Sequence, residues 1–273
     1  KMKPYTVLSI AGSDCSGGAG IQADLKTISA LGCYAATVIT AVTVQNTCGV
    51  ENVFPVPTEI IKTQIESVMN DIQIDAIKIG MVTDCTVIRM LAEILQQTAI
   101  PVVFDPVLIS SSGYPLMQPE AINTMYESLL PCCTLLTPNI PETEVLSHHT
   151  IKNVTDMHDA GRKILQSGCK AVLVKGGHLN GSAKTDVLIH GMNGELSQTY
   201  EAPEIHTNNS HGTGCTLSSA IAAWLAQGFS VPEAVAKGKI YLTEALAGAQ
   251  NLQIGHGHGP LNHFFNPKKL IVR

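Results

Sequence analysis

Short apolar, β-branched runs alternate with helical segments along almost the whole chain, and this alternation limits the possible folds more than any other feature. Such a chain forms βαβ units, in which a largely parallel sheet is covered by helices on both faces. One antiparallel hairpin is expected around Asn193-Gly194, a strong turn signal. Strands are predicted over 5–12, 36–44, 76–80, 101–107, 134–137, 171–177, 186–190 and 195–200. Helices are predicted over 21–32, 57–69, 84–97, 118–130, 154–166, 217–225 and 232–249, with a short one starting at Pro141.

The length, net charge and cysteine content of the chain exclude several classes of protein. No repeat, linker or composition break divides the 273 residues, so we expect one domain over 1–273, with Lys1 ahead of Met2 as a remnant outside the natural chain. A net charge of -5 without a basic run argues against nucleic acid as a partner. The eight cysteines form no C-x-x-C pair and suit reduced side chains. Without a secretory signal or a long apolar run, no membrane partner and a cytoplasmic location are expected.

Polar clusters follow almost every predicted strand. Because the carboxyl ends of parallel strands meet at one edge of a sheet, ligands of such proteins bind there. We therefore expect one ligand site at this edge of the sheet. The side chains expected at the strand ends are Asp14, Gln45, Met81, Asp105, Asn139 and Lys175.

The stretch 207–216 runs from small and polar residues directly into a predicted helix. Its backbone N–H groups would therefore lie free at a helix N-terminus, where the macrodipole favours an anion. Gly212 and Gly214 have no side chain to block a close approach. Cys215 lies beside them, and a helix N-terminus favours its thiolate form. The alternative is a tight loop that leads into a core helix.

Three further motifs at strand ends suit phosphoryl transfer. Asp105 could hold a magnesium shell, and Asn139 and Glu142, three residues apart on a new helix turn, suit contact with Mg²⁺ through water. Lys175, before two glycines, could meet a phosphate as a point charge. Each motif alone also fits a turn cap, a helix cap or a surface lysine. Together they supply the charge neutralisation and positioning that phosphoryl transfer needs.

Other motifs are weaker. Residues 18–23 match the dinucleotide pattern G-x-G-x-x-A, but the second predicted strand lacks the acidic residue that this pattern requires at its end. No G-x-x-x-x-G-K-[ST] motif occurs. His256 and His258 lack neighbouring cysteine or acidic ligands, so we interpret them as loop residues rather than metal ligands.

Taken together, the motifs resemble those of hydroxymethylpyrimidine/phosphomethylpyrimidine kinase, the thiamine-biosynthesis branch of the ribokinase-like superfamily. The resemblance covers essentially the whole chain. The motifs that carry it are AGSD at 11–14, GGAGIQADLKT at 17–27, QNT at 45–47, KIGM at 78–81, DPV at 105–107, TPNxxE at 137–142, VKGGH at 174–178 and HGTGCT at 211–216.

This resemblance implies a three-layer αβα fold around a mostly parallel sheet, without a separate lid domain. It also implies a homodimer that uses ATP and Mg²⁺. The implied substrate is 4-amino-5-hydroxymethyl-2-methylpyrimidine (HMP), which is phosphorylated first to its monophosphate and then to the diphosphate. The resemblance places Asp24, Gln45, Gly12, Val44 and Met81 at the pyrimidine. It places Asp105, Asn139, Glu142, Lys175, Thr207 and Gly212 at the phosphates, the nucleotide and the metal, with Asp105 and Glu142 as the metal-binding residues, through water.

The resemblance further implies that Gly212, Gly214, Lys175 and Cys215 carry the catalysis. GTGC occupies the position of GAGD in sugar kinases, so Cys215 is similar to their catalytic base. Two positions depart from the family pattern. Cys15 stands where Ser or Gly is usual. Ser111 stands where many members carry a lysine, which is expected to weaken affinity for ATP or the monophosphate.

Two alternatives stay open at this point. Related chains phosphorylate pyridoxal, a similar aromatic alcohol, so a pyridoxal kinase is the second enzymatic interpretation. A ligand-binding sensor that has kept the pocket is the non-enzymatic one. The full set of Asp105, Asn139, Glu142, Lys175 and GTGC argues against the sensor, because binding alone does not need a phosphoryl-transfer apparatus.

Overall fold

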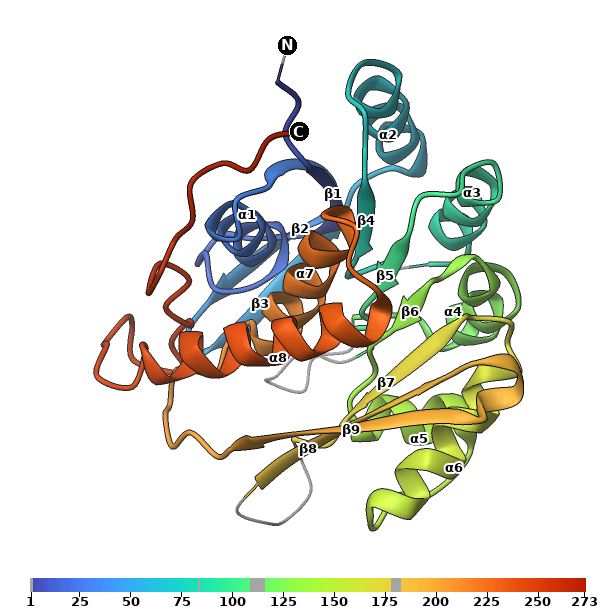
Figure 1. Ribbon diagram of the computed structural model, residues 1–273. Coiled ribbons are helices and arrows are strands. Elements are labelled where there is room, and N and C mark those ends of the chain that lie inside the picture. The colour runs from blue at the N-terminus through green and yellow to red at the C-terminus, as the bar shows by residue number, and fades with distance from the viewer. Residues whose placement is uncertain (1, 83, 109–115, 178–182) are drawn as a thin grey trace.

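Nine strands form one sheet in the part of the chain that the computed structural model describes, which is residues 2–82, 84–108, 116–177 and 183–273. The strand order is β3-β2-β1-β4-β5-β6-β7-β8-β9 (Figure 1). The six central strands are parallel, whereas β3, β8 and β9 run antiparallel to their neighbours. The strands are β1 Thr6–Asp14, β2 Tyr34–Asn46, β3 Gly49–Pro55, β4 Ala76–Ile79, β5 Val102–Phe104, β6 Leu135–Leu136, β7 Ala171–Lys175, β8 Ala183–His190 and β9 Leu196–Pro203.

Helices cover both faces of this sheet, as Figure 1 shows. The helices α1, α7 and α8 pack on one face around a core that contains Ile28 and Ile221. The helices α2 to α6 pack on the other face around a core that contains Ile65 and Met157. The predicted three-layer α/β fold is therefore confirmed. The helices are α1 Gly20–Ala30, α2 Thr58–Asp71, α3 Cys85–Leu95, α4 Pro119–Thr124, α5 Ile140–Ser147, α6 Val154–Leu165, α7 Thr213–Ala226 and α8 Val231–Ala247.

Two local features differ from the prediction. The segment 118–130 is not one helix, because α4 passes into a π-helical turn at Met125–Leu129 and a 3-10 turn at Leu130–Cys132. Pro131 lies in the first turn of the 3-10 segment and supplies no N–H to continue an α-helix. Strand β3 was not predicted at all. It is a largely exposed edge strand with polar residues on it, so it lacks the apolar run that marks the buried strands.

The parallel strands place their carboxyl ends along one edge of the sheet. The loops after β1, β4, β5, β6 and β7 leave from that edge, and α7 begins beside them. The predicted hairpin is confirmed as β8 and β9, which pair over their full length. No helix in the described ranges is long and apolar enough to cross a membrane. All eight cysteines are free.

The contact between α7 and the C-terminal segment has a consequence for stability. Thr216 Oγ1 lies 3.0 Å from Nε2 of His263, a side chain that is only 2% exposed. Burial, assisted by the charge of Lys26, lowers the pKa of His263 from 6.5 to about 4. The unfolded chain therefore takes up a proton at this histidine at a higher pH than the folded chain does.

We expect the free energy of unfolding to decline as the pH falls from 6.5 toward 4, by up to about 3 kcal/mol from this one group. Well above pH 6.5 the group is neutral in both states and its contribution is constant. Urea unfolding at pH 7.5 and pH 4.5 measures the loss, and the variant His263→Gln should show a smaller loss than the native sequence. Equal losses in the two proteins would assign the acid sensitivity to other groups.

Candidate active site

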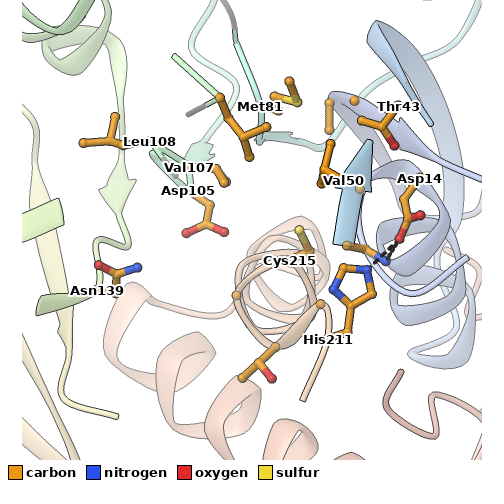
Figure 2. A pocket seen from close by; sticks show the side chains of 18 of the residues that line it. Asp14, Thr43, Val50, Met81, Asp105, Val107, Leu108, Asn139, His211 and Cys215 are labelled. Carbon is orange, nitrogen blue, oxygen red and sulfur yellow. Dashed lines mark hydrogen bonds and ion pairs between the residues drawn. The ribbon is translucent and has the colours of Figure 1, made fainter. Parts of the chain in front are cut away.

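A cavity of about 480 Å³ lies at the carboxyl edge of the sheet. It is open on one side, and Figure 2 shows side chains that reach into it from opposite walls. Asp105 and Asn139 lie on one wall, Asp14 and His211 lie on the other, and Cys215 lies between them. The structure thus brings together most of the residues predicted from the sequence. Those that line the cavity are Gly12, Gln45, Met81, Asp105, Asn139, Glu142, Lys175, Gly212, Gly214 and Cys215.

The start of α7 forms an anion-binding turn. Gly212 precedes the helix with a φ of 85° and supplies no side-chain cap. No described residue accepts a hydrogen bond from the backbone N–H of Gly214 or Cys215. These N–H groups lie at the positive end of the helix dipole, which is where a phosphate group gains most. The turn also packs against the loop that precedes α1, since a side chain on Gly212 would overlap the Gly18 carbonyl oxygen.

Asp14 holds this wall together. Its carboxylate accepts hydrogen bonds from the backbone N–H groups of Ser16, Gly18 and Ala19, and it lies 2.8 Å from His211 Nε2. Burial raises the pKa of Asp14, but the hydrogen bonds from His211 and Ser16 outweigh it and bring the value down to about 2. The same His211 nitrogen lies 3.1 Å from Nε2 of Gln45. Because this nitrogen donates its proton to Asp14, it cannot also accept from the Gln45 amide, and His211 links the loop after β1 to the anion-binding turn.

Lys175 and Asp105 form an ion pair on the opposite wall. Lys175 Nζ donates to Asp105 Oδ1 at 2.8 Å, and Thr137 Oγ1 donates to the same oxygen at 3.1 Å. Burial lowers the pKa of Lys175, but Asp105 and Glu142 raise it more, so the side chain remains an ammonium ion. The interpretation of Lys175 as a surface lysine is therefore wrong, because its side chain is only 15% exposed and faces the cavity.

Asn139 and Glu142 form a capping box at the start of α5. Glu142 N–H donates to Asn139 Oδ1 at 2.9 Å, and Asn139 N–H donates to Glu142 Oε2 at 2.8 Å. The structural interpretation of this motif is thus confirmed, and both residues also line the cavity. Burial raises the pKa of Glu142 to about 7, aided by Asp105 and opposed by Lys175.

These acidic residues fit a magnesium ion held mainly by water. A carboxyl group whose charge is disfavoured by burial and by a second carboxylate gains stability from a nearby cation. The described residues contain no group of three or more His, Cys, Asp or Glu side chains that could hold a metal directly. Mg²⁺ commonly keeps several waters and takes only one or two protein carboxylates together with phosphate oxygens. Asp105 and Glu142 would supply those carboxylates.

The expected thiolate at Cys215 is not supported by the surroundings of this residue. Burial raises its pKa to about 11, and the nearby charge of Lys78 only partly offsets this effect. The negative charges of Asp24 and Asp105 raise the pKa further. The sequence motif indicated the helix N-terminus correctly but carried no information on burial. Without ligands, Cys215 is therefore predominantly a thiol at neutral pH, and its thiolate is the minor form.

Three residues predicted at the site do not line the cavity. Asp24, predicted at the pyrimidine, is fully buried and accepts hydrogen bonds from Ser9, Lys78 and Ser219. Val44 is 52% exposed outside the cavity. Thr207 lies ahead of the turn, where its Oγ1 accepts from the Asn209 N–H. Ser111, the departure from the family pattern, lies outside the described residues.

Sequence reasoning assigned no role to Lys78 or to His211. Both belong to motifs that were recognised, KIGM and HGTGCT, but the motifs alone do not say which way these side chains point. Lys78 is fully buried in β4 and forms part of the cavity wall. Lys78 lies between apolar residues on a short buried strand. Because a buried lysine requires a charged or polar partner, this pattern is the signal from which its role could have been predicted.

Comparison with known proteins identifies kinases that are similar to this chain. The sequence profile described as "Phosphomethylpyrimidine kinase" matches residues 14–262. The chain is 45% identical over 266 residues to the hydroxymethylpyrimidine/phosphomethylpyrimidine kinase of Salmonella typhimurium, covering 96% of this chain and 98% of that protein.

Two solved structures are similar as well. One is the phosphomethylpyrimidine kinase of Clostridium difficile, with a TM-score of 0.77 and 48% identity over 88% of this chain and 99% of the other. The other is a pyridoxal kinase of Staphylococcus aureus in complex with AMP-PCP and pyridoxal, with a TM-score of 0.86 and 31% identity over 96% and 94% of the two chains. These matches extend over 88% to 96% of the chain, and the residues matched by the profile include the strand ends from Asp14 to Lys175. The chain belongs to the phosphomethylpyrimidine kinase family and has the ribokinase-like fold of these kinases.

Proposed function

We propose that the protein transfers the γ-phosphoryl group of ATP to HMP, and then a second one to the resulting monophosphate, for thiamine biosynthesis. The observation that carries the proposal is one cavity in which helix N–H groups without an acceptor among the described residues lie near a largely buried lysine–carboxylate pair. The 45% identity to a kinase named for both substrates supports the same acceptors.

Each wall of the cavity has a distinct part in this reaction. The N–H groups of Gly214 and Cys215 would bind the oxygens of the transferring group, and Lys175 would neutralise its charge. Mg²⁺, when bound, would neutralise part of the charge on the phosphate oxygens. Asp105 and Glu142 are the residues that would hold its water shell. Gly12, Gln45 and Met81 form the acceptor end of the cavity.

The acceptor end suits an aminopyrimidine. Gly12 leaves the surface open, since a Cβ there would lie 3.0 Å from Met81 Sδ. Gln45 offers both a donor and an acceptor to a heteroaromatic edge, and Met81 offers a polarisable surface to the ring. Thr43 Oγ1 lies 3.1 Å from Gln45 Oε1, within hydrogen-bond distance, and limits the orientations of the amide before the substrate arrives.

The assay for this proposal is ADP release with HMP, HMP monophosphate and pyridoxal, measured in parallel. We expect turnover with both pyrimidines. Absence of ADP release with every acceptor would instead support a non-catalytic pyrimidine-binding protein. Pyridoxal kinase is the second candidate activity, because a pyridoxal kinase of known structure superposes with a TM-score of 0.86. Turnover with pyridoxal alone would replace the proposal with this alternative.

Cys215→Ala is expected to lower HMP phosphorylation about a hundredfold and monophosphate phosphorylation less than tenfold. Only the first acceptor is an alcohol that must lose a proton, whereas a phosphate acceptor is already anionic at neutral pH. Single-turnover rates with each acceptor measure the difference. Cys48→Ala, which changes an exposed cysteine, is the matched control. Equal losses on both acceptors would show that Cys215 positions groups rather than accepting a proton.

We also propose that the protein acts as a cytoplasmic homodimer of single-domain chains. A row of exposed apolar side chains supports the dimer. Val42 and Val44 on β2 and Phe54 on β3 are 44%, 52% and 68% exposed, and Val42 pairs with Phe54 across the two strands. A second copy of this face would cover them, as large exposed apolar patches commonly mark interfaces.

A further inference from the structure

Lys78 is among the largest side chains that are completely buried in this protein's described residues. Its Nζ donates to both carboxylate oxygens of Asp24, at 2.9 and 2.8 Å. Ser9 Oγ and Ser219 Oγ each donate to one oxygen of the same carboxylate, at 2.6 and 2.7 Å. Asp24 is therefore fully hydrogen-bonded, and it holds the ammonium group in one position.

The surroundings are shaped around this ammonium group. A Cβ on Gly80 would lie only 2.8 Å from Nζ, so the strand end after β4 leaves space for the charge by having no side chain. The third N–H of Lys78 has no acceptor among the described residues. A buried ion pair is a costly way to stabilise a core, and apolar residues of similar size often do so better. Stability alone therefore does not account for the pair.

The cluster lies one helical turn from the anion-binding turn, because Ser219, which donates to Asp24, follows Cys215 by four residues on the same face of α7. Lys78 and Cys215 form parts of the same cavity wall. Lys78 is the strongest of the influences that favour the charged form of the Cys215 sulfur, and a hydrogen bond from the Gly20 backbone acts in the same direction. The charged groups that face this sulfur are Lys78 from β4, Asp24 from α1, Asp105 from the loop after β5 and Lys175 from the end of β7.

We propose that Lys78 is a positioning residue for phosphoryl transfer, whose buried charge acts on the Cys215 sulfur and stabilises its thiolate form. This inference rests on the proposed function. In the first transfer, the thiolate takes the proton of the acceptor hydroxyl and becomes a thiol. The hydroxyl oxygen forms a bond to the γ-phosphorus while the bond from phosphorus to the β–γ bridging oxygen breaks, and ADP leaves. The thiol then returns its proton to solvent.

The test is the rate at which iodoacetamide alkylates Cys215 in the full-length protein without ligands, followed by peptide-resolved mass spectrometry between pH 7.5 and 9.5. Below the pKa, this rate follows the thiolate fraction. Lys78→Met should lower the rate about three- to tenfold. A rise of about one unit in the pKa of Cys215 lowers the thiolate fraction about tenfold, and the greater nucleophilicity of the more basic thiolate offsets part of this loss. The kcat for HMP should fall by a similar factor, while the KM for ATP stays unchanged.

Two further variants separate charge from packing. Lys78→Met combined with Asp24→Asn removes both charges and leaves no unpaired buried ion, so it tests the proposal even if the single variant fails to fold. Its alkylation rate should fall in the same direction by a smaller factor, because Lys78 affects the sulfur more strongly than Asp24 does. Lys239→Met breaks another buried ion pair, in which Lys239 Nζ lies 2.6 Å from Asp186 Oδ2. It should leave the rate unchanged.

An unchanged rate in Lys78→Met, or an equal change in Lys239→Met, would overturn the inference. If the double variant alone folds, an unchanged rate in it has the same meaning. The alkylation readout does not depend on turnover. A native protein that fails to phosphorylate HMP would therefore refute the proposed function without deciding whether Lys78 acts on Cys215.

Discussion

Lys175→Met is expected to lower kcat/KM about a thousandfold with both HMP and its monophosphate. Both steps transfer the same phosphoryl group, and a charge positioned in a water-poor cavity stabilises the transition state far more than it would in solution. The substitution also leaves Asp105, whose side chain is 3% exposed, without its cationic partner. A loss of less than tenfold would remove Lys175 from the catalytic machinery.

The control for this variant is Lys184→Met. Lys184 also forms an ion pair, 2.9 Å from Glu204, but both side chains are partly exposed and outside the cavity. We expect its kcat/KM to remain within about twofold of the native value, since exposed ion pairs contribute little. The combination Lys175→Met with Asp105→Asn shows how much of any loss of stability comes from the unpaired carboxylate. Thermal unfolding of all these variants confirms that activity is compared between folded proteins.

Gly212→Ala is expected to abolish most of the activity and to destabilise the protein by about 3 kcal/mol. Two effects add at this position. The φ of 85° is unfavourable for any residue with a Cβ, and that Cβ would overlap the Gly18 carbonyl oxygen. The turn must therefore move away from the loop before α1, and its N–H groups lose their alignment. Urea unfolding and steady-state kinetics measure the two consequences.

Gly228→Ala separates these two effects. Gly228 has a φ of 87°, almost the same as that of Gly212, but a Cβ there would meet no atom within 4 Å. It should cost about 1 kcal/mol through backbone strain alone and leave kcat unchanged. The excess loss in Gly212→Ala then measures the close approach of the two loops. If both variants lose the same stability and neither loses activity, the packing of Gly212 against Gly18 has no part in the site.

The position of the site was predictable because it follows from chain order. Alternating strands and helices imply a parallel sheet, and a parallel sheet brings its carboxyl ends to one edge. Asp105, Asn139, Gln45 and Lys175 could therefore be placed together without any knowledge of their contacts. The edge strand β3 could not be predicted in this way, because its pairing partner and not its own composition makes it a strand.

The details that failed depend on burial, which a sequence shows only indirectly. Asp24 belongs to the same motif as the glycine-rich loop, yet one turn further along α1 it faces the core and meets Lys78. Cys215 was expected to ionise because it starts a helix, whereas the surrounding protein raises its pKa to about 11. The direction in which a helical side chain points and its depth below the protein surface are set by packing between distant segments. The spacing of residues in a motif therefore does not determine them.

The link between His211 and Asp14 joins residues 197 positions apart. A ribosome therefore makes the Asp14 side of this cavity wall long before it makes the His211 side. A nascent chain that ends before α7 already contains every strand of the described sheet, but it lacks the anion-binding turn at the start of α7. Nucleotide and vitamin precursor act on stability by mass action through the state that binds them. They therefore stabilise the folded protein and do not stabilise the nascent chain.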